Sequence, residues 1–193
     1  LRFLAGEFEK SADAFVHVRE ALRNPERFQG NEAIEKALLG QPDRMYRLLG
    51  ESFFRAGRYE DAEIMFRKAW KDGEQPLALR LARIAQKKDD LDGAEKHLDT
   101  CLANPDQNPG VEPYQLMADI LRAREKKPKQ VHRELVARLE RMLEKDGANV
   151  SLRFFLGEQY LQADRLKEAA EQFESLLVLA PGDDVLRRLI EIY

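Results

Sequence analysis

The sequence predicts an all-α fold in which antiparallel helix pairs pack side by side, and three observations support this prediction. Apolar residues recur at spacings of three and four, which is the pattern of helices with one buried face. The composition, 44% hydrophobic and 35% charged, is typical of helices whose long charged side chains cover the surface. The triplet Leu-Gly-Glu occurs at 49–51 and again at 156–158, which indicates an internal repeat.

The clearest unit covers residues 43–74. An apolar stripe at helical spacing predicts its first helix: Tyr46, Leu49, Gly50 and Phe53. The turn at 57–61 separates this helix from a second one, whose stripe consists of Ala62, Phe66 and Ala69. Gly50 and Ala62 are small enough to let the two helices approach closely, so that the phenylalanines of both stripes fill the space between them.

Three further helix pairs are predicted at 75–110, 111–149 and 150–183. The last pair repeats the first unit most closely, through Leu156, Gly157, Tyr160, Ala169, Phe173 and Pro181. The other two have weaker stripes, with Leu81, Ala82, Ala94, Leu98 and Cys101 in one and Tyr114, Met117, Ala118, Leu135 and Leu139 in the other. The extra residues of the third unit fall in its turn at 126–129. Asn149 is expected to cap the helix that follows it rather than to carry a glycan.

The ends of the chain complete a single predicted array over 1–193. Residues 1–25 are predicted to be a partial first repeat, and residues 26–42 exceed the repeat period and predict an inserted short helix. Residues 184–193 predict a terminal helix that either caps the array or begins another repeat. Its apolar stripe consists of Leu186, Leu189, Ile190 and Tyr193.

These positions resemble the tetratricopeptide repeat, whose pattern is W-x-x-L-G-x-x-Y, then A-x-x-x-F, then P, over about 34 residues. Tyr46 stands where the family has tryptophan, and Arg153 replaces it in the last unit. The resemblance is strong in 43–74 and 150–183 and weaker elsewhere. It implies a right-handed superhelical solenoid in which the first helix of each pair lines a concave, peptide-binding groove.

The groove face is expected opposite the Leu-Gly stripe of each first helix. Over residues 44–87 this face would carry six cations and one acid, Glu51, so the groove is expected to be partly basic and to attract an acidic segment. An Arg47–Glu51 pair on a solvated helix is an alternative explanation. Arg67 and Lys68 are predicted to lie on the opposite face. The candidate partner-binding residues are Arg44, Arg47, Phe54, Arg55, Arg80, Arg83, Lys87, Phe154 and Leu161.

The family branch that captures a chaperone's C-terminal carboxylate has Lys and Asn one turn apart on the first helix. Here these places read Arg47 and Glu51, so a chaperone co-factor role is not expected.

Neither a catalytic nor a metal site is predicted. The P-loop, nucleophile-elbow and H-E-x-x-H patterns do not occur, and His17, His97 and His132 fall on separate predicted helices. Cofactors are therefore not expected. With 32 basic and 35 acidic residues the net charge gives no reason to expect nucleic-acid binding, and the sequence contains no apolar run long enough for a membrane span.

The expected function is a non-catalytic scaffold that binds a peptide or helical segment of another protein. The alternative is a regulatory or assembly arm of a larger enzyme or of a secretion or envelope complex. Self-association through the terminal repeats would also cover the stripe at 184–193. The single cysteine, Cys101, cannot form an internal disulfide, which slightly favours the cytoplasm and leaves the bacterial periplasm as the other compartment.

Overall fold

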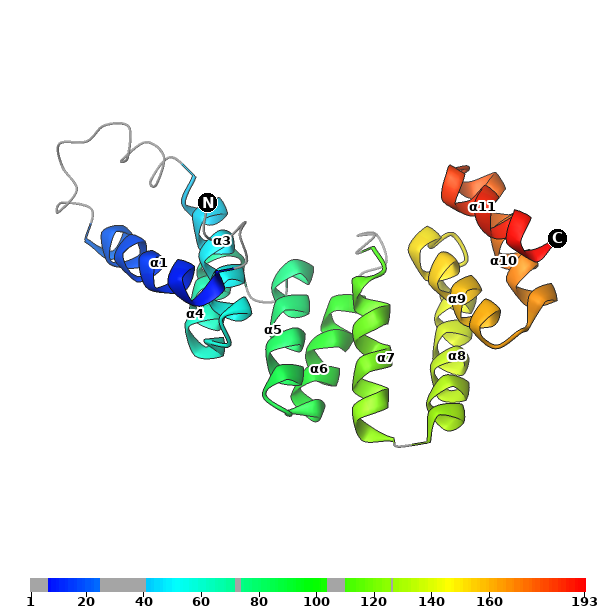
Figure 1. The fold of residues 1–193 in the computed structure, drawn as a ribbon, viewed down its shortest axis with the longest axis horizontal. Helices are drawn as coiled ribbons and strands as arrows, with labels where there is room; N and C mark the ends of the chain where they lie inside the picture. The colour runs from blue at the N-terminus through cyan, green and yellow to red at the C-terminus, as the bar shows by residue number, and fades with distance from the viewer. Residues whose placement is uncertain (1–6, 25–40, 72–73, 104–109, 126) are drawn as a thin grey trace. The chain divides into compact units, whose positions relative to one another are not determined.

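The computed structural model describes residues 7–24, 41–71, 74–103, 110–125 and 127–193 (Figure 1). Every regular element within these ranges is an α-helix, so the predicted all-α fold class is confirmed. The chain forms two compact units, residues 1–90 and residues 91–193, and each is described by itself. The predicted inserted helix at 26–42 lies almost entirely outside the described residues.

Unit 1 contains four described helices that contact one another in succession (Figure 1). They are α1 (Phe8–Arg23), α3 (Pro42–Arg55), α4 (Tyr59–Ala69) and α5 (Gln75–Lys87). Pro42 occupies the start of α3, where a missing backbone N–H costs nothing because helix starts leave N–H groups unpaired. Gly57, with φ of +73°, makes the turn between α3 and α4, a backbone conformation that favours glycine.

The core of unit 1 lies between α3 and α4. Leu49, Phe53, Ala62 and Met65 are completely buried, and Phe66 is 1% exposed. A Cβ atom on Gly50 would lie only 2.4 Å from the ring of Phe66, so the glycine is required for this close approach, as the sequence predicts. The α1 helix adds to this core through Ala12, which is also fully buried.

Unit 2 contains six described helices, and each contacts the next (Figure 1). They are α6 (Leu91–Leu102), α7 (Glu112–Arg124), α8 (Pro128–Lys145), α9 (Val150–Gln162), α10 (Leu166–Leu179) and α11 (Asp183–Ile192). The α8 helix begins at Pro128, inside the segment 126–129 that was predicted as a turn, because proline is well suited to the first position of a helix. Asn149 caps α9 as predicted, since its Oδ1 accepts a hydrogen bond of 2.9 Å from the Leu152 N–H.

The core of unit 2 repeats the contact seen in unit 1. Leu152, Leu156 and Phe173 are buried between α9 and α10, and a Cβ atom on Gly157 would lie 2.8 Å from the Phe173 ring. Cys101 is fully buried and takes a small-residue position in the core of the same unit, as the sequence predicts. In both the α3–α4 and the α9–α10 pair, a glycine of the first helix therefore leaves room for a phenylalanine ring of the second helix.

Candidate functional site

The candidate residues of unit 1 lie on two helices. The α3 helix carries Arg44, Arg47, Phe54 and Arg55, and the α5 helix carries Arg80, Arg83 and Lys87. Arg44, Arg47, Arg55 and Lys87 are exposed, whereas Phe54, Arg80 and Arg83 are half-buried. These side chains therefore differ in how far they are accessible to a partner.

Phe54 is the centre of one group of these residues. The Arg83 guanidinium from α5 lies 4.4 Å from the centroid of the Phe54 ring, and its Nη1 is 3.7 Å from Glu51 Oε2. Arg55 Nε donates a hydrogen bond of 3.1 Å to the other oxygen of Glu51. We call Glu51, Phe54, Arg55 and Arg83 the Phe54 surface. Two of the predicted groove cations thus share one carboxylate, which offsets part of their positive charge.

Two aromatic residues that sequence analysis did not select extend the Phe54 surface. The ring of Tyr59, the first residue of α4, lies 5.7 Å from the Phe54 ring, and the Arg55 guanidinium lies 5.4 Å from the ring of Phe8 in α1. Both aromatics occupy the first position of a helix that follows a glycine-containing segment. Their position next to a turn could have pointed to these two rings in the sequence. The apolar period alone does not indicate on which side of the turn each ring lies.

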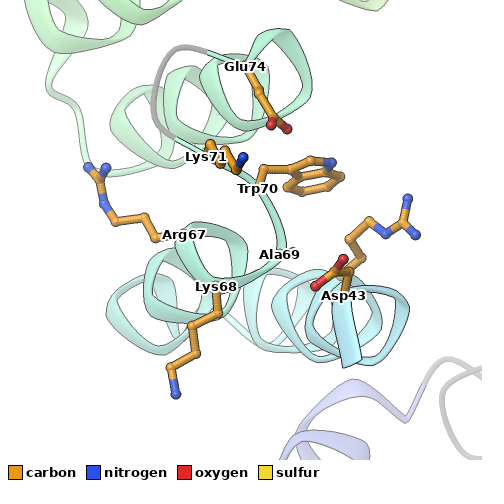
Figure 2. Close-up of a pocket in the computed structure, with 8 residues that line it drawn as sticks. Asp43, Arg67, Lys68, Ala69, Trp70, Lys71 and Glu74 are labelled. Atoms are coloured by element: carbon orange, nitrogen blue, oxygen red, sulfur yellow. The ribbon is translucent and has the colours of Figure 1, made fainter. Parts of the chain in front are cut away.

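Arg47 takes part in a different arrangement. Its guanidinium lies 5.7 Å from the ring centroid of Trp70, the residue that directly follows α4. Both residues line a cavity of about 650 Å³ in unit 1, which we call the Trp70 pocket. Figure 2 shows Trp70 with its neighbours in this pocket. Its lining residues are Asp43, Arg47, Arg67, Lys68, Ala69, Trp70, Lys71 and Glu74.

The Trp70 pocket changes the interpretation of two further cations. Arg67 and Lys68, which were predicted to lie on the face opposite the groove, line the same cavity as Arg47. A charge reversal at these two positions is therefore not an independent control for one at Arg47. Trp70 itself was missed, although it is the only tryptophan of the chain and directly follows a predicted helix.

The candidate residues of unit 2, Phe154 and Leu161, are both half-buried on α9. The Phe154 ring meets the Phe173 ring of α10 edge-on, with their centroids 5.6 Å apart. Phe154 therefore packs against the second helix of its own pair. Glu158, on the same helix, forms an ion pair with Arg188 of α11.

Titratable groups in unit 2 show the effect of burial. Burial and the nearby Arg165 guanidinium lower the pKa of His132, and its Nε2 is buried without a hydrogen-bond partner in the described part of the chain. Burial also raises the pKa of Tyr114 to about 12. Tyr160 donates a hydrogen bond of 2.6 Å to Glu140, and burial together with this bond raises its pKa above the usual value for tyrosine. These groups belong to the helix packing rather than to a cleft.

Two other kinds of site are absent from the described part of the chain. Across the ranges that the structure covers, no group of three or more His, Cys, Asp or Glu side chains is arranged to hold a metal ion. Among the same residues, no helix is long and apolar enough to cross a membrane.

The repeat pattern is matched by a family model described as tetratricopeptide repeat. The match covers residues 15–75 and 136–184, which together make up more than half of the chain. The chain belongs to the tetratricopeptide repeat family. The two matched regions include the α3–α4 and α9–α10 pairs, in which Gly50 and Gly157 seat their phenylalanines.

Solved structures similar to this tetratricopeptide repeat protein include three from different sources. Yeast Tom70 is 19% identical, and the match covers 99% of this chain and 37% of that chain at a TM-score of 0.52. TTC0263, a thermophilic repeat protein of Thermus thermophilus, is 18% identical over 78% of this chain and 81% of that one, at a TM-score of 0.49. MamA AMB-1 is 24% identical over 79% and 81%, at a TM-score of 0.42. No curated protein matches the sequence significantly.

Family membership supports a general function. Tetratricopeptide repeats are typically non-catalytic modules that bind other proteins, and the fold of this chain supports a protein–protein interaction scaffold. The surface that binds, and the chemistry of the partner, have to be argued from the residues themselves.

Proposed function

We propose that this repeat protein is a non-catalytic scaffold that binds a peptide or helical segment of a partner protein along its partly basic first-helix faces. In unit 1 the Phe54 surface is the proposed centre of binding. The observation that carries this proposal is the Arg83 guanidinium placed 4.4 Å from the ring of the half-buried Phe54.

An aromatic ring next to a guanidinium is a good anchor for a partner. Aromatic and arginine side chains dominate the binding energy of many interfaces, because they combine a large contact area with directional hydrogen bonds. Glu51 pairs with both Arg55 and Arg83, and these ion pairs restrict the two guanidinium groups before a partner arrives. Binding then costs less side-chain entropy, because these long side chains are not immobilised at that moment.

The positive charge of α3 and α5 favours a partner segment that is acidic. Arg44, Arg80 and Lys87 lie on the same two helices as the Phe54 surface, and they add positive charge that steers an acidic segment toward α3 and α5. Phe154 and Leu161 are proposed as apolar contacts of unit 2, independently of unit 1. Their half-buried side chains on α9 support this part of the proposal.

The experiment begins with capture of a partner by the intact chain, followed by affinity measurements on the purified pair. Phe54→Ala and the double change Arg80→Glu/Arg83→Glu should each weaken binding by about tenfold or more, and low salt should speed association. The matched control is Lys129→Glu/Lys167→Glu in unit 2, where both lysines are exposed and the change in net charge is the same. Equal loss in both double variants, or no loss in either, would refute the Phe54 surface as the binding site.

A second candidate function is an assembly arm of a larger enzyme or of a secretion or envelope complex, including self-association. It is favoured by exposed apolar side chains at the end of unit 2: Val178 is 85% exposed, Ile190 78% and Tyr193 83%. Water-exposed apolar groups of this size favour coverage by another protein surface.

A further inference from the structure

The Trp70 pocket lies where α4 ends and α5 begins, beside the start of α3. Figure 2 shows the Trp70 indole extending into this space between Glu74 and Asp43, while Arg67 and Lys68 point outward from α4. The pocket volume of about 650 Å³ is within the usual range for a ligand site, roughly 300–1,000 Å³. It is therefore large enough to receive a few side chains of another protein.

The indole is held in place by the core of unit 1. Its ring centroid lies 6.0 Å from that of Phe66, which is itself buried against Gly50. The Trp70 backbone is extended, with φ of −142° and ψ of 153°, and its N–H donates a hydrogen bond of 3.1 Å to the Phe66 carbonyl oxygen. A half-buried ring fixed in this way offers apolar contact area at little cost in entropy.

The described lining of the pocket carries an excess of positive charge, although the chain as a whole carries −3. Among the described residues that line the pocket, four are basic and two are acidic. Arg67 is paired with Glu63 one turn earlier on α4, and Lys68 Nζ lies 5.3 Å from the centroid of the Tyr46 ring. The cations best placed to act together with the indole are therefore Arg47, whose guanidinium lies over the ring, and the exposed Lys71.

We propose that the Trp70 pocket binds a carboxylate-rich peptide segment of a partner protein, with an apolar side chain against the indole and carboxylates paired with Arg47 and Lys71. Charge complementarity selects an acidic segment, and the ring selects an apolar neighbour within that segment. Asp43 and Glu74 on the rim repel ligands of very high charge density, so a spaced set of carboxylates suits the pocket better than a polyphosphate.

This site is separate from the Phe54 surface and does not depend on it. The Phe54 surface uses Glu51, Arg55 and Arg83, whereas the Trp70 pocket uses the end of α4 and the start of α5. Loss of binding at one site therefore does not decide whether the other site binds.

The test uses the full chain and a synthetic peptide of glutamate and leucine residues. Because Trp70 is the only tryptophan, its fluorescence reports binding at this pocket directly, and anisotropy of a labelled peptide gives an independent affinity. We expect saturable binding with a Kd below about 1 mM. A peptide with glutamine in place of glutamate should bind at least about tenfold more weakly, because it loses the charge-assisted contacts.

Variants then locate the contacts. Arg47→Gln/Lys71→Gln should weaken binding by about tenfold or more, and Trp70→Leu should do the same in the anisotropy assay. The control Lys129→Gln/Lys167→Gln makes the same change of net charge in unit 2 and should leave the affinity unchanged. Circular dichroism of each variant establishes that the helices are retained.

Three results would overturn the proposal. The first is an unchanged tryptophan emission and anisotropy at millimolar peptide. The second is equal loss of affinity in the pocket and control double variants, which would indicate general charge attraction. The third is binding of inorganic polyphosphate at the same pocket as tightly as the peptide, which would indicate an anion site without peptide selectivity.

Discussion

Gly50 lies within α3 and faces Phe66 of α4, so adding one methyl group at this position should destabilise unit 1. The new Cβ would lie 2.4 and 2.5 Å from two atoms of the Phe66 ring, closer than atoms can approach without movement. Phe66 is 1% exposed, and its ring centroid lies 6.0 Å from that of Trp70, so the ring has little room to move.

The magnitude follows from two opposing effects of Gly50→Ala. Replacing glycine by alanine inside a helix is worth roughly 0.5–1 kcal/mol in favour of the folded state. Overpacking a well-filled core costs roughly 1–3 kcal/mol. The two effects leave a net loss of about 0–2.5 kcal/mol in the free energy of unfolding, and the 2.4 Å contact places Gly50→Ala in the upper half of that range. We expect a smaller loss for Gly157→Ala, where the nearest ring atom is 2.8 Å away.

Urea unfolding followed by tryptophan fluorescence measures this effect in unit 1 alone, because Trp70 is the only tryptophan and lies in that unit. The change Phe66→Leu removes ring atoms next to Gly50, so the double variant Gly50→Ala/Phe66→Leu should lose less stability than the sum of the two single variants. A Gly50→Ala protein as stable as the wild type, with an unchanged m-value, would refute the close approach of α3 and α4.

Other predictions concern unit 2. Asn149→Ala should cost about 1 kcal/mol of unfolding free energy through loss of the α9 cap, with Asn149→Gly costing only a few tenths; equal losses in urea unfolding would contradict the cap. Because burial lowers the pKa of His132, the unfolded state binds more protons below about pH 6.5, so stability should fall as the pH drops through about 6. His132→Leu should reduce this loss of stability at low pH. If the free energy of unfolding depends on pH identically in the variant and the wild type, His132 is not its cause. Ile190→Glu should abolish any concentration-dependent association seen in sedimentation velocity, whereas the exposed Lys167→Glu should not.

Most of the fold could be predicted from the sequence, because its signals are local. The α3–α4 and α9–α10 pairs were recognised from one small residue and one phenylalanine on adjacent helices, and the structure brings these residues into contact. The start of α8 was misplaced, since Lys and Pro at 126–129 are typical of a turn and Pro128 is equally suited to a first helical position. Helix ends depend on a few residues and carry less information than helix interiors.

The candidate site was predictable only in outline. The basic character of α3 and α5 followed from counting side chains on one helix face, but the positions of those side chains did not. Arg47 and Arg83 both lie on the predicted groove face, yet one lies over Trp70 and the other over Phe54. A long arginine side chain has many rotamers of similar energy, so the neighbouring helix decides which one is adopted.

The sequence by itself determined the helix pairs, the repeat family and the glycine and phenylalanine positions at which paired helices meet. The helical period and the repeat spacing place these residues on the facing sides of two helices that follow one another in the chain. Only the tertiary structure decided that Glu51 pairs with two groove cations, that Trp70 forms a pocket with Arg47, and that Arg67 and Lys68 line it. These contacts join side chains from different helices. Their distances depend on how the helices pack, which the period of the apolar pattern does not specify.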